Sequence, residues 1–172
     1  MKSKATNLDL NLIQYYLISF FPISLILGNG VINLNSILII SIGLTLILKQ
    51  KSISNFKNYN ELVFLAIFFF SSLFSTLLFS DEIFKSVTYL RFFFLVLIII
   101  LFLDKNEKKV NNIFLFYGLV NLIIILDVIF QSYTHYNILG LKNKYYFNSS
   151  FYGSEKIAGG HIQFFSFFTI IF

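Results

Sequence analysis

The chain has 172 residues, of which 57% are hydrophobic and only 12% are charged, so it is not an ordinary water-soluble domain, which carries about 25% charged residues. The net charge of +5 does not indicate nucleic-acid binding, because the lysines lie in short segments between apolar stretches, a pattern typical of membrane proteins. Cysteine is absent, which excludes disulfides and thiolate metal sites.

Polar breaks divide the chain into apolar stretches of roughly 16 to 19 residues, which as helices would span about 24 to 28 Å, close to the thickness of a hydrocarbon core. We therefore predict an all-α fold, a polytopic transmembrane bundle of about six helices that forms one domain over residues 1–172. The stretches are Leu12 to Leu27, Val31 to Leu48, Leu62 to Phe79, about Ile83 to Leu103, Ile113 to Phe130, and Ile157 onward.

The first two stretches are joined by Gly28-Asn29-Gly30, a link so short that it predicts an antiparallel helical hairpin. Pro22 lies inside the first stretch and is expected to bend its helix, which a bilayer tolerates when a neighbour satisfies the freed carbonyl. Lys2 and Lys4 precede this stretch, as in a signal peptide, but the apolar run is long and no small-x-small cleavage site follows. We expect a retained helix.

The last stretch is still apolar at Phe172, with no polar residues at its exit. Since a spanning helix needs a polar exit, we expect the chain to be the N-terminal part of a longer protein.

The distribution of lysine and arginine along the chain predicts the orientation of the protein in the membrane. The N-terminus, the Lys49 to Lys57 segment and the Lys105 to Lys109 segment would share one side of the membrane, and they hold eight of the thirteen basic residues: Lys2, Lys4, Lys49, Lys51, Lys57, Lys105, Lys108 and Lys109. Basic loops favour the cytoplasmic side. We therefore expect a multi-pass membrane protein with a cytoplasmic N-terminus.

Two ionisable residues inside apolar stretches, Arg91 and Asp127, require an explanation, since burying a charge in a membrane costs about 2.5 to 3.5 kcal/mol on insertion scales. In one interpretation, Arg91 anchors its helix at the interface and Asp127 caps or pairs locally. In the other, Arg91 and Lys85 bind an anion such as a diphosphate, which suits the guanidinium fork. The residues alone leave both open.

The segment from about Gln131 to Lys156 would lie outside the membrane on the opposite side from the basic loops. It is rich in Tyr and Asn, a composition found both at sugar-binding surfaces and in interfacial aromatic belts, and composition favours the belt. His135 and His161 have the residue type of a general base, but an isolated histidine is more often structural. Gly159-Gly160 is expected to permit close helix packing. No zinc spacing, Walker loop, GxSxG elbow or DxD-type pair occurs, so we predict neither a metal site nor a cofactor.

Three short segments carry a resemblance to a known family: Leu126-Asp127 with Phe130-Gln131, Asn137-Ile138-Leu139-Gly140, and the run from Ser149 to Gly159. They resemble the O-antigen ligase and O-antigen polymerase superfamily, in which a helix ends in an Asp and a Gln, a short loop carries a Gly, and an F-G-D-E segment opens the next helix. The segment Ser86 to Phe92 is similar to the family's arginine-bearing helix. Where family members often have an Arg and an Asp, this chain has Phe147 and Ser154.

The resemblance implies a metal-independent membrane glycosyltransferase that moves a glycan from an undecaprenyl-diphosphate carrier, at the periplasmic face, to lipid A-core or to another carrier-linked glycan. It implies a location in the bacterial inner membrane. It also implies that Arg91 holds the diphosphate and that Asp127, Gln131 and Glu155 shape the outer pocket. The catalytic residues are expected beyond Phe172, so this chain alone would be inactive.

Two other functions stay open. A transporter or flippase of a lipid-linked glycan would also use many helices and a basic cavity, although no paired broken helices are evident. A membrane subunit without enzymatic activity would only pack against a partner.

Overall fold

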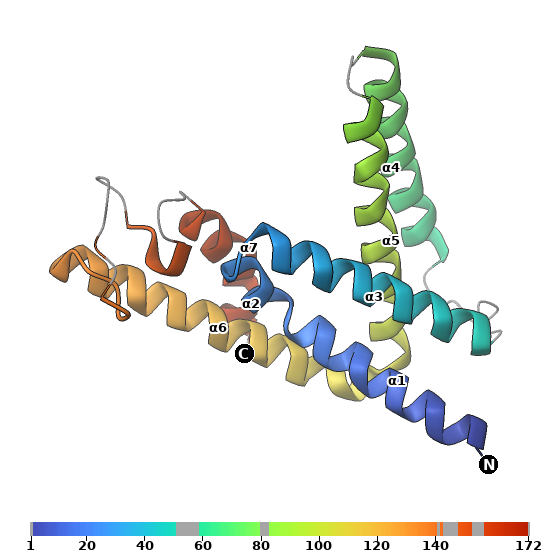
Figure 1. Cartoon of the computed structure of the whole chain (residues 1–172), viewed down its shortest axis with the longest axis horizontal. Helices are drawn as coiled ribbons and strands as arrows, with labels where there is room; N and C mark the ends of the chain where they lie inside the picture. Colours follow the sequence, from blue (N-terminus) through green and yellow to red (C-terminus); the bar gives the residue numbers. More distant parts are fainter. Residues whose placement is uncertain are drawn as a thin grey trace. The chain divides into compact units, whose positions relative to one another are not determined.

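The computed structural model describes residues 2–50, 59–79, 83–140, 142, 148–152 and 157–171, and every regular element in these ranges is a helix (Figure 1). The predicted all-α fold class is confirmed. The elements in chain order are α1 (Lys2–Ser19), α2 (Phe21–Ile26), α3 (Asn29–Gln50), α4 (Tyr59–Phe79), α5 (Ile83–Lys105), α6 (Glu107–Thr134), the 3₁₀ helix η1 (Ser150–Tyr152) and α7 (Ala158–Ile171).

The first predicted helix is two helices, because Pro22 interrupts it. A proline has no N–H, so the carbonyl of Ile18, four residues earlier, loses its helical partner. The Tyr117 hydroxyl of α6 donates to this carbonyl at 2.6 Å. The expected bend and the expected satisfaction of the freed carbonyl by a neighbour are both confirmed. The helix α1 begins at Lys2, before the apolar stretch that starts at Leu12, since polar residues continue the helical hydrogen bonding where the apolar pattern stops.

The chain turns between α2 and α3 at Gly28, whose φ of +102° is readily adopted only by glycine. The Gly28 carbonyl accepts the N–H groups of Val31 and Ile32 at 3.1 and 3.2 Å, which starts α3 directly after the turn. Asn35, near the start of α3, donates to the Ser24 hydroxyl of α2 at 3.4 Å. The predicted reversal at Gly28 is confirmed.

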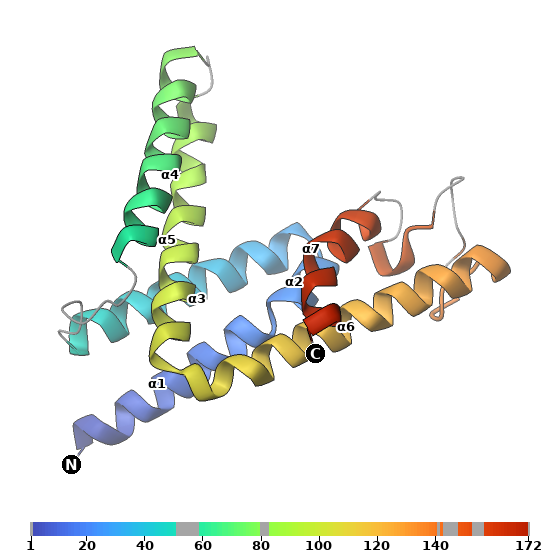
Figure 2. The same ribbon diagram turned by 180° about the vertical axis from the view of Figure 1, so that it is seen from behind.

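The chain divides into two compact units. The first comprises residues 1–17 and 36–106; in it α4 and α5 lie side by side (Figures 1 and 2), and Phe93 of α5 packs on Phe69 of α4 with ring centroids 5.5 Å apart. Gly43 of α3 packs so closely on α5 that a Cβ there would lie 2.2 Å from Cγ2 of Ile98. Gly43 therefore makes the close contact between these two helices.

The second unit comprises residues 18–35 and 107–172, with α6 packed along α7. Tyr117 of α6 contacts Phe165 and Phe168 of α7 edge to face, at centroid distances of 5.4 and 5.3 Å. The expected role of Gly159-Gly160 in close packing is wrong: no described atom lies within 4 Å of a Cβ built at either glycine. Large aromatic side chains therefore pack against one another in the part of the interface around Tyr117.

Two helical stretches, Asn29–Lys49 and Glu107–Thr134, are long and apolar enough to cross a membrane, judged on the described residues. The shorter α7, with 14 residues, does not reach the length of a span. A bundle of six spans is thus not established by the described helices.

The two faces of α6 differ from those of a helix in a water-soluble protein, because its exposed face is apolar while its buried face combines apolar residues such as Ile113 and Ile124 with polar ones. Its buried face carries Asn121, Asp127 and Gln131, each at most 1% exposed. Its exposed face is apolar, with Leu115, Leu119, Leu122, Leu126 and Ile129 each about half exposed. Water would drive the opposite arrangement. Polar residues that face inward and apolar residues that face outward suit a lipid environment.

Candidate functional site

The C-terminal end of α6 holds the segment that follows it through a buried carboxylate. Asp127 is fully buried. Its Oδ1 accepts the backbone N–H of Ile138 at 2.7 Å, and its Oδ2 accepts the Ser150 hydroxyl at 2.6 Å. Because both oxygens are engaged, Asp127 in this geometry positions the outer segment.

Ser150 is the point at which the hydrogen bonds of this segment converge. Its backbone N–H donates to Oε1 of Gln131 at 2.9 Å, and its carbonyl accepts from Nδ2 of Asn137 at 3.1 Å. Its φ of +51° is unusual for a residue with a side chain. A strained conformation of this kind persists only when its surroundings determine it, and here the hydroxyl, the N–H and the carbonyl of Ser150 are all bound.

A tight turn presents Ile138 to Asp127. The N–H of Gly140 bonds the carbonyl of Asn137 at 2.8 Å, and Gly140 takes a φ of +78°, which a glycine adopts without strain. Tyr136 and Lys142 form an isolated antiparallel bridge across the turn. Glycine at this position is thus required by the turn itself.

The helix α6 extends into the segment that was predicted to lie outside the membrane. The helix continues past Gln131 to Thr134, where the Thr134 hydroxyl bonds the carbonyl of Phe130 at 2.9 Å. His135 then ends α6 with a φ of 61° while its N–H bonds the Gln131 carbonyl at 2.9 Å. Gln131 is therefore part of α6, and the extracytoplasmic segment from about Gln131 to Lys156 stays a prediction.

Tyr152 and His161 form a buried pair between η1 and α7. The Tyr152 hydroxyl is hydrogen bonded to Nδ1 of His161, and the imidazole lies 4.5 Å from the Phe165 ring, centroid to centroid. Burial raises the pKa of Tyr152, so its hydroxyl stays protonated and acts as the donor. The proton of a neutral His161 is then on Nε2, a buried atom with no hydrogen-bond partner in the described part of the chain.

A second unpaired polar group lies on α6. Asn121 is fully buried, and neither its amide nitrogen nor its amide oxygen has a partner within the described ranges. Tyr117 of α6 contacts Phe165 of α7. Asn121 follows Tyr117 by one helical turn and His161 precedes Phe165 by one turn, so Asn121 and His161 lie at the same level of the helix pair. The interior between α6 and α7 therefore contains unused hydrogen-bonding capacity.

The predicted cationic residues lie in the other unit. Arg91 of α5 is half-buried; its guanidinium lies 4.8 Å from the centroid of the Phe92 ring, and its Nε has no partner among the described atoms. Lys85 lies in the first turn of α5, and Glu155 falls outside the described residues. A pocket shared by Arg91 and Asp127 remains a prediction.

The structure unites two of the five predicted binding residues, Asp127 and Gln131, through their common partner Ser150. Sequence reasoning missed Ser150 and Asn137 as parts of the site. Their signal was present, since both lie in the segments that carry the family resemblance, but nothing in the local sequence indicates that Ser150 would bond α6.

No protein-family profile, curated protein or solved structure matches this chain.

Proposed function

We propose that the chain is a multi-pass protein of the bacterial inner membrane with its N-terminus in the cytoplasm. The apolar exposed face of α6, together with the buried polar residues Asn121, Asp127 and Gln131, is the observation that carries the membrane assignment. Six spans would follow the six apolar stretches, of which Asn29–Lys49 and Glu107–Thr134 meet the requirements of length and composition. The distribution of lysines supports the orientation.

We further propose that the protein takes part in glycan transfer of the O-antigen ligase or polymerase type. The donor would be an undecaprenyl-diphosphate-linked glycan, and the acceptor lipid A-core or another carrier-linked glycan. The proposal rests on the resemblance of the segments around Asp127, Asn137 and Ser150. It gains support from their geometry, because these three residues are joined by hydrogen bonds.

The residues would have distinct roles. Arg91 would bind the diphosphate; its half-buried guanidinium, stacked on Phe92, has donors suited to phosphate oxygens. Lys85, two helical turns earlier, would add positive charge. Asp127, Gln131 and Glu155 would shape the outer pocket.

A transporter or flippase of a lipid-linked glycan is the second candidate. The observation that favours it is the pair of buried, unpaired polar groups on α6 and α7, Asn121 and Nε2 of His161. Polar groups inside a helix bundle often mark a substrate or proton pathway. Carrier-linked glycan that crosses the membrane without forming a new glycosidic bond would favour this function.

Replacement of Arg91 in the native host tests the transferase. Arg91→Ala should abolish the transfer of glycan from the carrier to its acceptor, while the amount of protein in the membrane stays unchanged. Arg91→Lys, which keeps the charge but not the fork, should retain part of the transfer. Lys49→Ala is the control for lost positive charge. Normal transfer by Arg91→Ala would contradict the role of this residue.

A further inference from the structure

The turn from Asn137 to Gly140 exposes two apolar side chains, which together are called the apolar tip below: Ile138 is 59% exposed and Leu139 is 69% exposed. The backbone of this turn is nevertheless held in place. The Ile138 N–H donates to Oδ1 of Asp127 at 2.7 Å, and a bond from the Gly140 N–H to the Asn137 carbonyl closes the turn. The apolar tip is therefore presented by a fixed conformation.

The chain doubles back along α6 to form this turn. The helix ends at Thr134, and the φ of 61° at His135 redirects the chain. Ile138 is then bonded to Asp127, which precedes Thr134 by about 10 Å along the helix axis. Asp127 also lies about 4.5 Å before Phe130, the last residue of the apolar stretch. The apolar tip thus lies at the level of the apolar part of α6.

The surface of α6 on either side of Asp127 is apolar as well. Ile123 and Phe130 precede and follow Asp127 by about one helical turn on the same side of the helix, and they are 50% and 45% exposed. Leu126, at the same level as Asp127, is 54% exposed. The apolar tip therefore continues an exposed apolar surface of α6.

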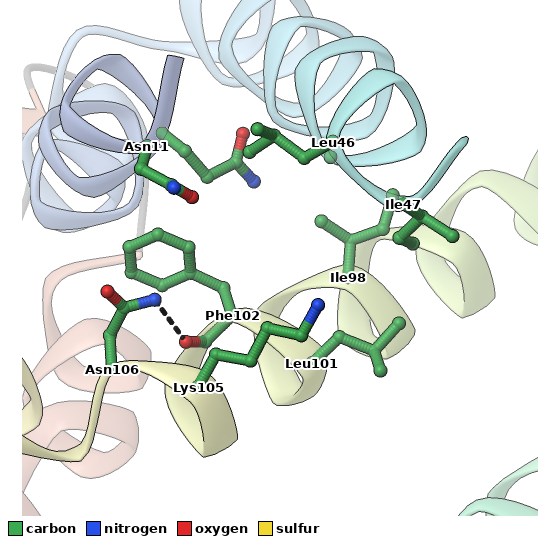
Figure 3. A pocket seen from close by; sticks show the side chains of 10 residues that line it. Asn11, Leu46, Ile47, Ile98, Leu101, Phe102, Lys105 and Asn106 are labelled. Carbon is green, nitrogen blue, oxygen red and sulfur yellow. Dashed lines mark hydrogen bonds between the residues drawn. The ribbon is translucent and has the colours of Figure 1, made fainter. Parts of the chain in front are cut away.

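The pocket of the first unit is a different kind of apolar site, because it is too small for a lipid chain. It lies between α1, α3 and the end of α5, where Leu46, Ile98 and Phe102 contribute to its lining (Figure 3). It has room for about two water molecules.

We propose that the apolar tip inserts into the outer leaflet of the membrane, where Ile138 and Leu139 contact lipid acyl chains just below the headgroups. Backbone outside a helix is tolerated at this depth when the protein satisfies its hydrogen bonds, as Asp127 does for the Ile138 N–H. Lys142 is exposed and forms a backbone bridge with Tyr136 across the turn, so its long side chain reaches the headgroup phosphates. The inference rests on the proposed membrane location and orientation but not on glycan transfer.

Tryptophan fluorescence measures the depth of the apolar tip, because the chain contains no tryptophan. Leu139→Trp is reconstituted into phosphatidylcholine vesicles and is quenched either by lipids brominated on their acyl chains or by iodide on both sides of the membrane. Two matched variants on the exposed face of α6 mark the depth: Leu126→Trp at the level of Asp127, and Tyr133→Trp about 10 Å further out. Leu139→Trp should lose as much emission to brominated lipid as Leu126→Trp does, and less emission to iodide than Tyr133→Trp does.

Thermal unfolding of each variant verifies folding, and Ile138→Trp supplies a second position in the apolar tip. Quenching of Leu139→Trp by iodide to the same extent as Tyr133→Trp would place the apolar tip in water and overturn the inference. Quenching by neither agent would mean that protein covers the tip, which overturns lipid contact equally. A Leu126→Trp that is open to iodide and closed to brominated lipid would overturn the proposed membrane location itself, and the inference with it.

Discussion

The Ser150 hydroxyl donates a 2.6 Å hydrogen bond to Oδ2 of Asp127, although 23 residues separate the two in the chain. This contact ties the outer segment to the end of an apolar helix. Since Asp127 is fully buried, its carboxylate depends on the Ser150 hydroxyl and the Ile138 N–H as donors in place of water. The carboxylate and the strained serine therefore stabilise each other.

Loss of the Asp127 carboxylate should destabilise the outer segment. Asp127→Ala leaves the Ile138 N–H and the Ser150 hydroxyl without an acceptor and should cost about 2 kcal/mol of unfolding free energy. Asp127→Asn keeps an acceptor for Ile138 and should cost less. Thermal unfolding in detergent measures both. Asp104→Ala, at a half-exposed position, is the control; an equal effect there would contradict a specific role for Asp127.

The hydrogen bond from the Tyr117 hydroxyl to the Ile18 carbonyl should stabilise the protein only because Pro22 has no N–H to donate to that carbonyl. Tyr117→Phe removes the donor to the Ile18 carbonyl and should cost about 1 kcal/mol. Pro22→Ala supplies a new N–H, so Tyr117→Phe should cost less in that background. A double-mutant cycle of unfolding free energies measures the coupling. Full additivity of the two changes would show that the hydroxyl does not replace the missing helical bond.

Two glycines of α3 should respond differently to alanine. A Cβ at Gly43 would lie 2.2 Å from Ile98 Cγ2, whereas a Cβ at Gly30 meets no described atom within 4 Å. Gly43→Ala should cost about 1 to 3 kcal/mol, and Gly30→Ala should be neutral or stabilising, because alanine favours helix. Ile98→Ala should relieve the clash in a Gly43→Ala background. Equal melting temperatures for the two glycine variants would contradict the close packing of α3 on α5.

The buried Tyr152 hydroxyl should make stability depend on alkaline pH. Its pKa is raised above the ordinary value by burial, so folding favours the neutral phenol. This contribution is complete below the unfolded pKa of about 10 and is lost as the pH rises above it. Melting temperatures between about pH 8 and about pH 11 should therefore fall further for the wild type than for Tyr152→Phe. If melting temperature falls equally with pH in the wild type and in Tyr152→Phe, then Tyr152 does not contribute to the pH dependence of stability.

Periodicity and composition predicted the helical class and most helix positions, because an apolar stretch long enough to cross a bilayer has few alternatives to a helix. The prediction for Leu62 to Phe79 misses the start of α4 by only three residues. Helix ends were less predictable, since polar residues such as Thr134, whose hydroxyl bonds the Phe130 carbonyl, continue a helix beyond its apolar stretch.

Contacts between distant segments could not be read from local sequence. Asp127 was identified because a carboxylate is rare in an apolar stretch, but its partner Ser150 depends on the path of the whole outer segment. The same applies to glycine: Gly159-Gly160 has the composition of a packing motif but meets nothing described, whereas Gly43 contacts Ile98 only because of how α3 and α5 pack.

Side-specific labelling of single cysteines is the most direct test of the central claim that these apolar helices cross a bilayer. The chain contains no cysteine, so Ser132→Cys and Ser54→Cys each introduce one unique thiol. In intact cells, a membrane-impermeant maleimide should label Ser132→Cys but should label Ser54→Cys only after the membrane is opened. Labelling of both positions from the same side would contradict the proposed topology.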